Sequence, residues 1–204
     1  MIEECQNNRF TYKKTKAFWD NFNKLACEYS FESISYHAVI RDKMLFLLSY
    51  SYGIRIEEVI KLFLSDFNFT TLTHESYGSV YIKGFNTRLI YPIFHETTAE
   101  VRTYIDTISS GLKFFDQNIF TTTKGNELSI HYINNRLRFY NSKLQLNQRI
   151  DSLNCFRQFY IADILRIKGI SQSFINNQIG NNISNNQVYL HLQPSKTYTG
   201  GYYV

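Results

Sequence analysis

Five short stretches of the chain carry residue types that could act together on a phosphate group. In chain order they contain Arg55 and Glu58, Lys83 and Arg88, Asn154 and Arg157, Asn181, and Tyr189. Arginine donates two parallel hydrogen bonds to phosphate oxygens, which lysine does with less geometric control. A tyrosine hydroxyl can act as a nucleophile, and a lysine ammonium can donate a proton. These residue types therefore suit phosphodiester transfer, provided that the fold brings the stretches together.

The order of these stretches resembles the tyrosine recombinase family of phage integrases and Xer-type or Cre-type recombinases. Residues 52–59 are similar to the G-x-R-x-x-E-L box of that family, and residues 81–92 to its G-K-G-x-x-x-R-x-x-P hairpin. Residues 153–159 stand where the family reads H-x-L-R-H, residues 178–181 replace L-G-H, and residues 189–191 match Y-x-H. The resemblance covers residues 39 to 192 and leaves out the first 35.

The resemblance implies a role for each matched residue. Arg55 and Arg157 would hold the scissile phosphate, with Glu58 supporting the first arginine. Tyr189 would be the nucleophile that forms a 3′-phosphotyrosyl bond, and Lys83 would be the acid that protonates the departing 5′-oxygen. Because the phosphotyrosyl bond conserves the bond energy, neither a metal ion nor a nucleotide cofactor is implied.

Two asparagines stand where the family usually has histidine. Asn154 and Asn181 can still hydrogen-bond a phosphate oxygen through the amide NH₂, but an amide cannot shuttle a proton as imidazole does. We count both as catalytic candidates and expect a slower or differently tuned enzyme. Rival nucleophiles to Tyr189 exist only beyond the expected last catalytic helix, at Tyr198, Tyr202 and Tyr203.

The formal net charge of +5 is compatible with a polyanionic partner, although charge alone is a weak indication. Residues 124–143 place several basic and amide side chains on one predicted helix, where they could contact DNA backbone and bases. A solvated basic helix face explains the same pattern equally well. The candidate DNA-binding residues are Arg88, Lys124, Asn134, Arg136 and Arg138.

Apolar spacing predicts helices that would position these residues. The expected helices span 15–30, 36–51, 56–64, 96–109, 129–145, 152–168, 171–179 and, less clearly, 184–192. Runs of β-branched and aromatic residues predict three antiparallel strands at 67–73, 79–83 and 88–94. This order predicts a mostly helical α+β fold, and the resemblance implies the catalytic core of DNA breaking-rejoining enzymes. We divide the chain into an N-terminal helical extension, 1–35, and a catalytic domain, 36–204.

The leading hypothesis is site-specific DNA recombination by integration, excision or inversion. The expected partner is double-stranded DNA, bound by a homotetramer on two DNA sites, and a monomer without DNA is compatible with the sequence. Two alternatives stay open: a catalytically weakened, recombinase-like DNA-binding protein, and a type IB topoisomerase. Three cysteines without metal-ligand spacing and no bilayer-length apolar run favour a cytoplasmic, nucleoid-associated protein of a prokaryote or virus, with no membrane partner.

Overall fold

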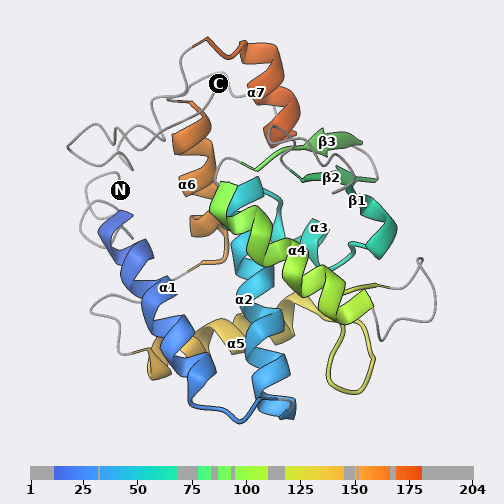
Figure 1. The fold of residues 1–204 in the computed structure, drawn as a ribbon. Coiled ribbons are helices and arrows are strands. Elements are labelled where there is room, and N and C mark those ends of the chain that lie inside the picture. The colour runs from blue at the N-terminus through green and yellow to red at the C-terminus, as the bar shows by residue number, and fades with distance from the viewer. Residues whose placement is uncertain are drawn as a thin grey trace.

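The computed structural model describes residues 12–31, 33–68, 78–83, 87–92, 95–109, 118–144, 150, 152–165 and 169–180 (Figure 1). Its helices are α1 Tyr12–Cys27, α2 Ile34–Tyr52, α3 Ile56–Val59, the 3-10 turn η1 Leu64–Asp66, α4 His95–Ser109, α5 Ile130–Lys143, α6 Asn154–Ile164 and α7 Gln172–Ile179. The strands are β1 Phe67–Asn68, β2 Ser79–Ile82 and β3 Arg88–Ile90. The predicted fold class, mostly helical with one small three-stranded antiparallel sheet, is confirmed. The helix expected at 184–192 lies outside the described residues.

Helix α2 is the centre of the structure and packs most extensively against α6 (Figure 1). The Ser33 side chain caps its N-terminus by accepting the Tyr36 N–H at 3.1 Å, and Gly53 ends it in the left-handed conformation with φ of 64°. Every residue from Met44 to Tyr52 is buried. A helix that is buried all round has neighbours on several sides, and α2 contacts α1, α3, α4 and α6.

An aromatic cluster joins α1 to the rest of the core. Phe18 and Phe22 of α1 are fully buried and pack against Phe46 of α2, whose ring stacks on Phe156 of α6 with centroids 5.4 Å apart. Tyr140 of α5 closes the cluster, 4.5 Å from the Phe22 ring. Fully buried aromatic side chains contribute much of the stabilisation of a small domain. Helix α1 therefore shares one hydrophobic core with the elements that follow it.

The sheet has the order β1-β2-β3, and both pairs are antiparallel. In the register of β2 and β3, Ile82 faces Arg88 and Val80 faces Ile90, and all four side chains are buried. Tyr81 and the Leu89 opposite it alternate to the exposed face. The sheet therefore turns one face toward the helices and carries Arg88 on that inner face.

The helix expected at 56–64 is shorter in the structure because the chain pairs with a distant segment instead. After α3 ends at Val59, the Leu62 carbonyl accepts the Ile119 N–H at 3.1 Å, and Phe63 forms an isolated antiparallel bridge with Asn118. The chain then makes the short turn η1 and enters β1 directly. Among the described helices, none is long and apolar enough to cross a membrane.

Candidate active site

The N-terminus of α3 presents Arg55 and Glu58 side by side. Arg55 follows the turn at Gly53 and is the N-cap residue, with φ of −66° and ψ of 143°. The Glu58 carboxylate accepts the Arg55 backbone N–H at 3.0 Å and lies 3.3 Å from the Arg55 guanidinium. A glutamate at the third helical position commonly reaches back in this way to satisfy a free N–H of the first turn. The spacing of the two residues in the sequence thus fixes their contact.

Arg88 reaches the same carboxylate from the sheet. Its two terminal nitrogens donate to the two oxygens of Glu58 at 2.9 and 2.7 Å, a bidentate geometry that is among the stronger ion pairs in proteins. The Arg88 side chain is only 2% exposed. In the structure it holds Glu58 from the inner face of the sheet, and its expected contact with DNA stays a prediction. Burial raises the pKa of Glu58, but hydrogen bonding and charge from Arg88, with a smaller contribution from Arg55, outweigh it and lower the pKa.

Replacing Glu58 by glutamine should destabilise the chain by about 2 to 3 kcal/mol, because the buried Arg88 charge loses its counterion. The lowered pKa of Glu58 means that this stabilisation is complete above its ordinary value of 4.5 and is lost as the pH falls through the lower, folded-state value. Urea unfolding at pH 7 measures the loss. The matched control is Glu57→Gln, since Glu57 is the exposed neighbour on the same turn and should cost less than about 0.5 kcal/mol. Equal losses in the two variants would contradict this account.

Arg157 of α6 completes the cluster from a third element. Its guanidinium donates to the carbonyl of Gly53, two residues before Arg55, and to the carbonyl of Ile179 at the end of α7. Burial, together with the positive charges of Arg55 and then Arg88, lowers the pKa of Arg157 to about 10, and Glu58 partly opposes the shift. The side chain therefore stays charged at neutral pH. Three guanidinium groups around one carboxylate leave an excess of positive charge, which favours an anion such as a phosphate.

Gln178 fixes α7 to the sheet. Its amide oxygen accepts the Tyr91 N–H at 2.8 Å and its amide nitrogen donates to the Leu89 carbonyl at 2.9 Å. One buried side chain thus bonds the outer edge of β3 as a further strand would. The sequence predicts that this strand runs to 94, whereas its pairing with β2 ends at Ile90. Gly180 then ends α7 so close to β3 that a Cβ there would lie 2.8 Å from the Arg88 guanidinium carbon.

Replacing Gln178 by alanine should cost about 2 kcal/mol of unfolding free energy, because it leaves a backbone donor and a backbone acceptor without partners. It should also loosen the attachment of α7, and with it the chain that leads toward Asn181. Urea denaturation followed by circular dichroism measures the effect. Gln172→Ala, at an exposed position in the first turn of the same helix, should change stability by less than about 0.5 kcal/mol. A result in which both alanine variants are alike would argue against the attachment.

The remaining catalytic candidates are placed unevenly. Lys83 follows β2, and its ammonium lies 2.6 Å from the Asp66 carboxylate with the side chain 56% exposed. Asn154 is exposed in the first turn of α6, three residues before Arg157, and its backbone N–H donates to the Ser152 hydroxyl. Asn181 and Tyr189 lie outside the described residues, so the structure leaves their positions as predictions.

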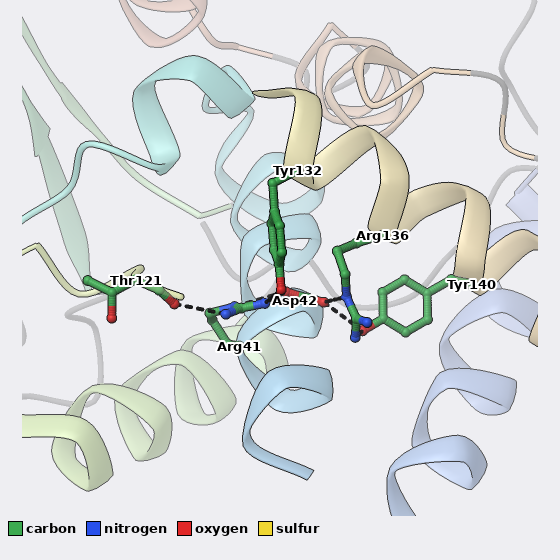
Figure 2. A network of polar contacts seen from close by, with 6 residues as sticks. All are labelled: Arg41, Asp42, Thr121, Tyr132, Arg136 and Tyr140. Atoms are coloured by element: carbon green, nitrogen blue, oxygen red, sulfur yellow. Dashed lines mark hydrogen bonds and ion pairs between the residues drawn. The ribbon is translucent and has the colours of Figure 1, made fainter. Parts of the chain in front are cut away.

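Figure 2 shows a buried polar network that includes Arg136, one of the residues expected to contact DNA. Asp42 of α2 is fully buried and accepts from Arg41 at 2.6 and 2.9 Å, from Tyr140 at 2.7 Å and from Arg136. Arg41 also donates to Thr121 and Tyr132. The network joins α2 to α5 and to the segment before it. Arg136, expected on a DNA-facing surface, therefore has an internal partner and is about one-fifth exposed.

The other candidates for DNA contact remain at the surface. Arg138 is exposed on α5 and donates to the Asn135 side chain at 3.2 Å, Asn134 is half-buried, and Lys124 is exposed in the turn before the helix. Their contact with DNA stays a prediction.

Sequence reasoning missed three residues that shape the site: Asp66, Tyr160 and Gln178. The fully buried Tyr160 ring fills the space beside Gly53, where a Cβ would approach it to 2.2 Å. Asp66 had a detectable signal, because an acidic residue three positions after Phe63 can cap the turn between them. Gln178 and Tyr160 gave none, since their partners lie in remote parts of the chain.

No model of a protein family and no curated protein matches the chain by sequence. Solved structures do match its fold. XerA recombinase has a TM-score of 0.64 at 13% identity, covering 93% of this chain and 59% of its own. XerH site-specific recombinase, solved in a pre-cleavage complex with its difH substrate, has a TM-score of 0.63 at 14% identity. The match covers 91% of this chain and 49% of the XerH chain. The Tn1549 transposon integrase, in complex with circular intermediate DNA, has a TM-score of 0.60 at 12% identity. The match covers 94% of this chain and 62% of the integrase chain.

These matches define the class of fold. The chain has the tyrosine recombinase catalytic fold, and the structural resemblance that the sequence motifs predicted is confirmed. The chain spans between 49% and 62% of the length of these three recombinase structures.

Proposed function

We propose that the chain cleaves and rejoins duplex DNA through a 3′-phosphotyrosyl intermediate on Tyr189, as the catalytic part of a site-specific recombination. The observation that carries the proposal is the convergence of Arg55 and Arg157. They come from remote parts of the sequence, and yet Arg157 donates to the Gly53 carbonyl beside Arg55 and its pKa responds to the Arg55 charge. A pair of arginines held on one anion site suits the stabilisation of a pentacovalent phosphate.

The chemistry follows from these groups. The Tyr189 hydroxyl gives its proton to solvent water and attacks the phosphorus, forming the tyrosyl P–O bond as the bond from phosphorus to the 5′-oxygen breaks. Lys83 gives its proton to that oxygen, which leaves as a 5′-hydroxyl. Attack by a 5′-hydroxyl of another strand, which returns a proton to the lysine, reverses the step and releases the tyrosine, which takes its proton back from water. The guanidinium groups of Arg55 and Arg157 stabilise the charge on the nonbridging oxygens in both directions.

Duplex DNA is the partner that this function requires. The XerH and Tn1549 structures are complexes with DNA, and this chain has their fold and an excess of positive charge. Exchange between two duplexes requires two cleaved sites, for which a homotetramer is the arrangement that we propose. Arg138, Asn134 and Lys124 would contact the duplex beside the cleavage site.

The test uses a probe that needs no known site. A pool of random-sequence duplexes, each carrying a nick that lets the short cleaved end diffuse away, is incubated with the 204-residue chain. Covalent complexes are trapped by denaturation, and the bound DNA is sequenced. The proposal expects an adduct enriched for one sequence, with the nucleotide mapped by mass spectrometry to the peptide that contains Tyr189. A pool that binds and yields no adduct would overturn it.

Binding without turnover is a second candidate, and one observation favours it. In this structure both terminal nitrogens of Arg157 donate to backbone carbonyls, and Asn154 stands where the family has an ionisable histidine. Two of the five N–H groups of that guanidinium are thus directed to the backbone, and the residue is only 7% exposed, so fewer donors remain for a phosphate. Sequence-selective binding with no adduct, in the experiment above, is the outcome that this candidate expects.

A further inference from the structure

Lys83 has a built partner that the sequence motifs do not include. Asp66, the last residue of η1, is only 3% exposed, and one oxygen of its carboxylate accepts the Phe63 N–H at 2.9 Å. The other oxygen lies 2.6 Å from the Lys83 ammonium. That ammonium also lies over the Phe63 ring, 5.4 Å from its centroid. A carboxylate and an aromatic face together hold the charged end of a side chain whose remainder is exposed.

The pairing of strands fixes this arrangement. Asp66 directly precedes β1 and Lys83 directly follows β2, and the two strands are paired with Phe67 opposite Val80. The backbone positions of Asp66 and Lys83 are therefore set by the sheet, whereas an isolated surface ion pair depends on two mobile side chains. The carboxylate is further held by its bond to the Phe63 N–H, which leaves its second oxygen at ion-pair distance from the lysine ammonium.

The pair lies along the sheet from the arginine cluster. Ile82, the residue before Lys83, pairs across the sheet with Arg88, whose guanidinium shares Glu58 with Arg55. The Asp66 carboxylate holds the Lys83 ammonium close to the end of β2, the strand next to the one that carries Arg88.

We propose that Asp66 is the positioning residue of Lys83, and that it acts on strand cleavage only through that lysine. This inference rests on the proposed function. During cleavage the proton on Lys83 Nζ passes to the 5′-oxygen as the bond from phosphorus to that oxygen breaks, and the neutral amine later regains a proton from the attacking 5′-hydroxyl. Asp66 touches neither the phosphate nor the nucleophile, and it orients the donor.

The test compares two leaving groups. Asp66→Asn keeps an oxygen for the Phe63 N–H and removes the charge that holds the lysine. It is assayed on the nicked duplex recovered from the random pool, and on the same duplex with sulfur in place of the 5′-bridging oxygen. A thiolate is a far weaker base than an alkoxide and leaves without a proton donor. We expect adduct formation to slow by roughly 10- to 100-fold on the oxygen duplex and by less than about threefold on the sulfur duplex.

A double-mutant comparison separates this role from a structural one. In a Lys83→Ala chain, adding Asp66→Asn should have no further effect on the oxygen duplex. Asp106→Asn, which removes a carboxylate from the exposed side of α4, is the matched control and should leave both rates unchanged. Equal slowing of Asp66→Asn on both duplexes, or losses that multiply with Lys83→Ala, would overturn this inference alone. A native chain with no adduct on either duplex would overturn the proposed function, and the inference with it.

Discussion

Tyr189→Phe should form no detectable covalent adduct with the selected duplex, a loss of at least about 10⁴-fold, while binding it within about threefold of the native affinity. The phenyl ring keeps the volume of tyrosine and lacks only the attacking oxygen. No other group in the proposed step can replace that oxygen, since the arginines stabilise charge and the lysine gives a proton. Labelled duplex on a denaturing gel measures the adduct, and a native gel measures binding.

Controls for this substitution come from the same aromatic tail. Replacing each rival tyrosine singly by phenylalanine should leave adduct formation intact. The three positions are Tyr198, Tyr202 and Tyr203. An adduct that survives Tyr189→Phe, or that maps to one of these three, would move the nucleophile and contradict the assignment. Loss of binding together with the adduct would show instead that the phenol is needed to hold the DNA.

The fold could be predicted because its signals are local. Apolar spacing located all seven α-helices among the described residues. Gly53 and Gly180 lie at the ends of two of them, where both adopt positive φ. The predicted helix and strand ends that the structure corrects depend on pairing with remote parts of the chain. The third predicted helix stops early because residues 62–63 pair with 118–119, and β3 stops at Ile90, where its pairing with β2 ends.

The site was predictable only in part, for the same physical reason. Arg55 and Glu58 are three residues apart at a helix start, so their contact follows from helix geometry. Basic residues elsewhere were expected to face DNA, and nothing local shows whether a remote acid lies beside them. Arg88 meets Glu58 and Arg136 meets Asp42, each from another element. A surplus of arginine in the sequence therefore indicates a phosphate site and cannot say which arginines reach it.

Gly53→Ala should destabilise the chain by about 2 to 5 kcal/mol. Two costs add: alanine at φ of 64° is strained by about 1 to 2 kcal/mol, and its Cβ would lie 2.2 Å from the Tyr160 ring, an overlap worth a further 1 to 3 kcal/mol. The ring cannot swing aside because it is fully buried. Adduct formation should fall as well, since the Gly53 carbonyl is an acceptor for Arg157 and the turn also places Arg55.

The matched control isolates the contact with the ring from the backbone strain. Gly125 also has positive φ, at 80°, and a Cβ there would meet nothing within 4 Å, so Gly125→Ala should cost only about 1 to 2 kcal/mol and leave adduct formation unchanged. Urea unfolding of both variants gives the comparison. Similar losses would mean that backbone strain accounts for the whole effect and that the Tyr160 ring yields. A larger loss at Gly53, accompanied by slower cleavage, would show that close packing of α6 on this turn holds the two arginines together.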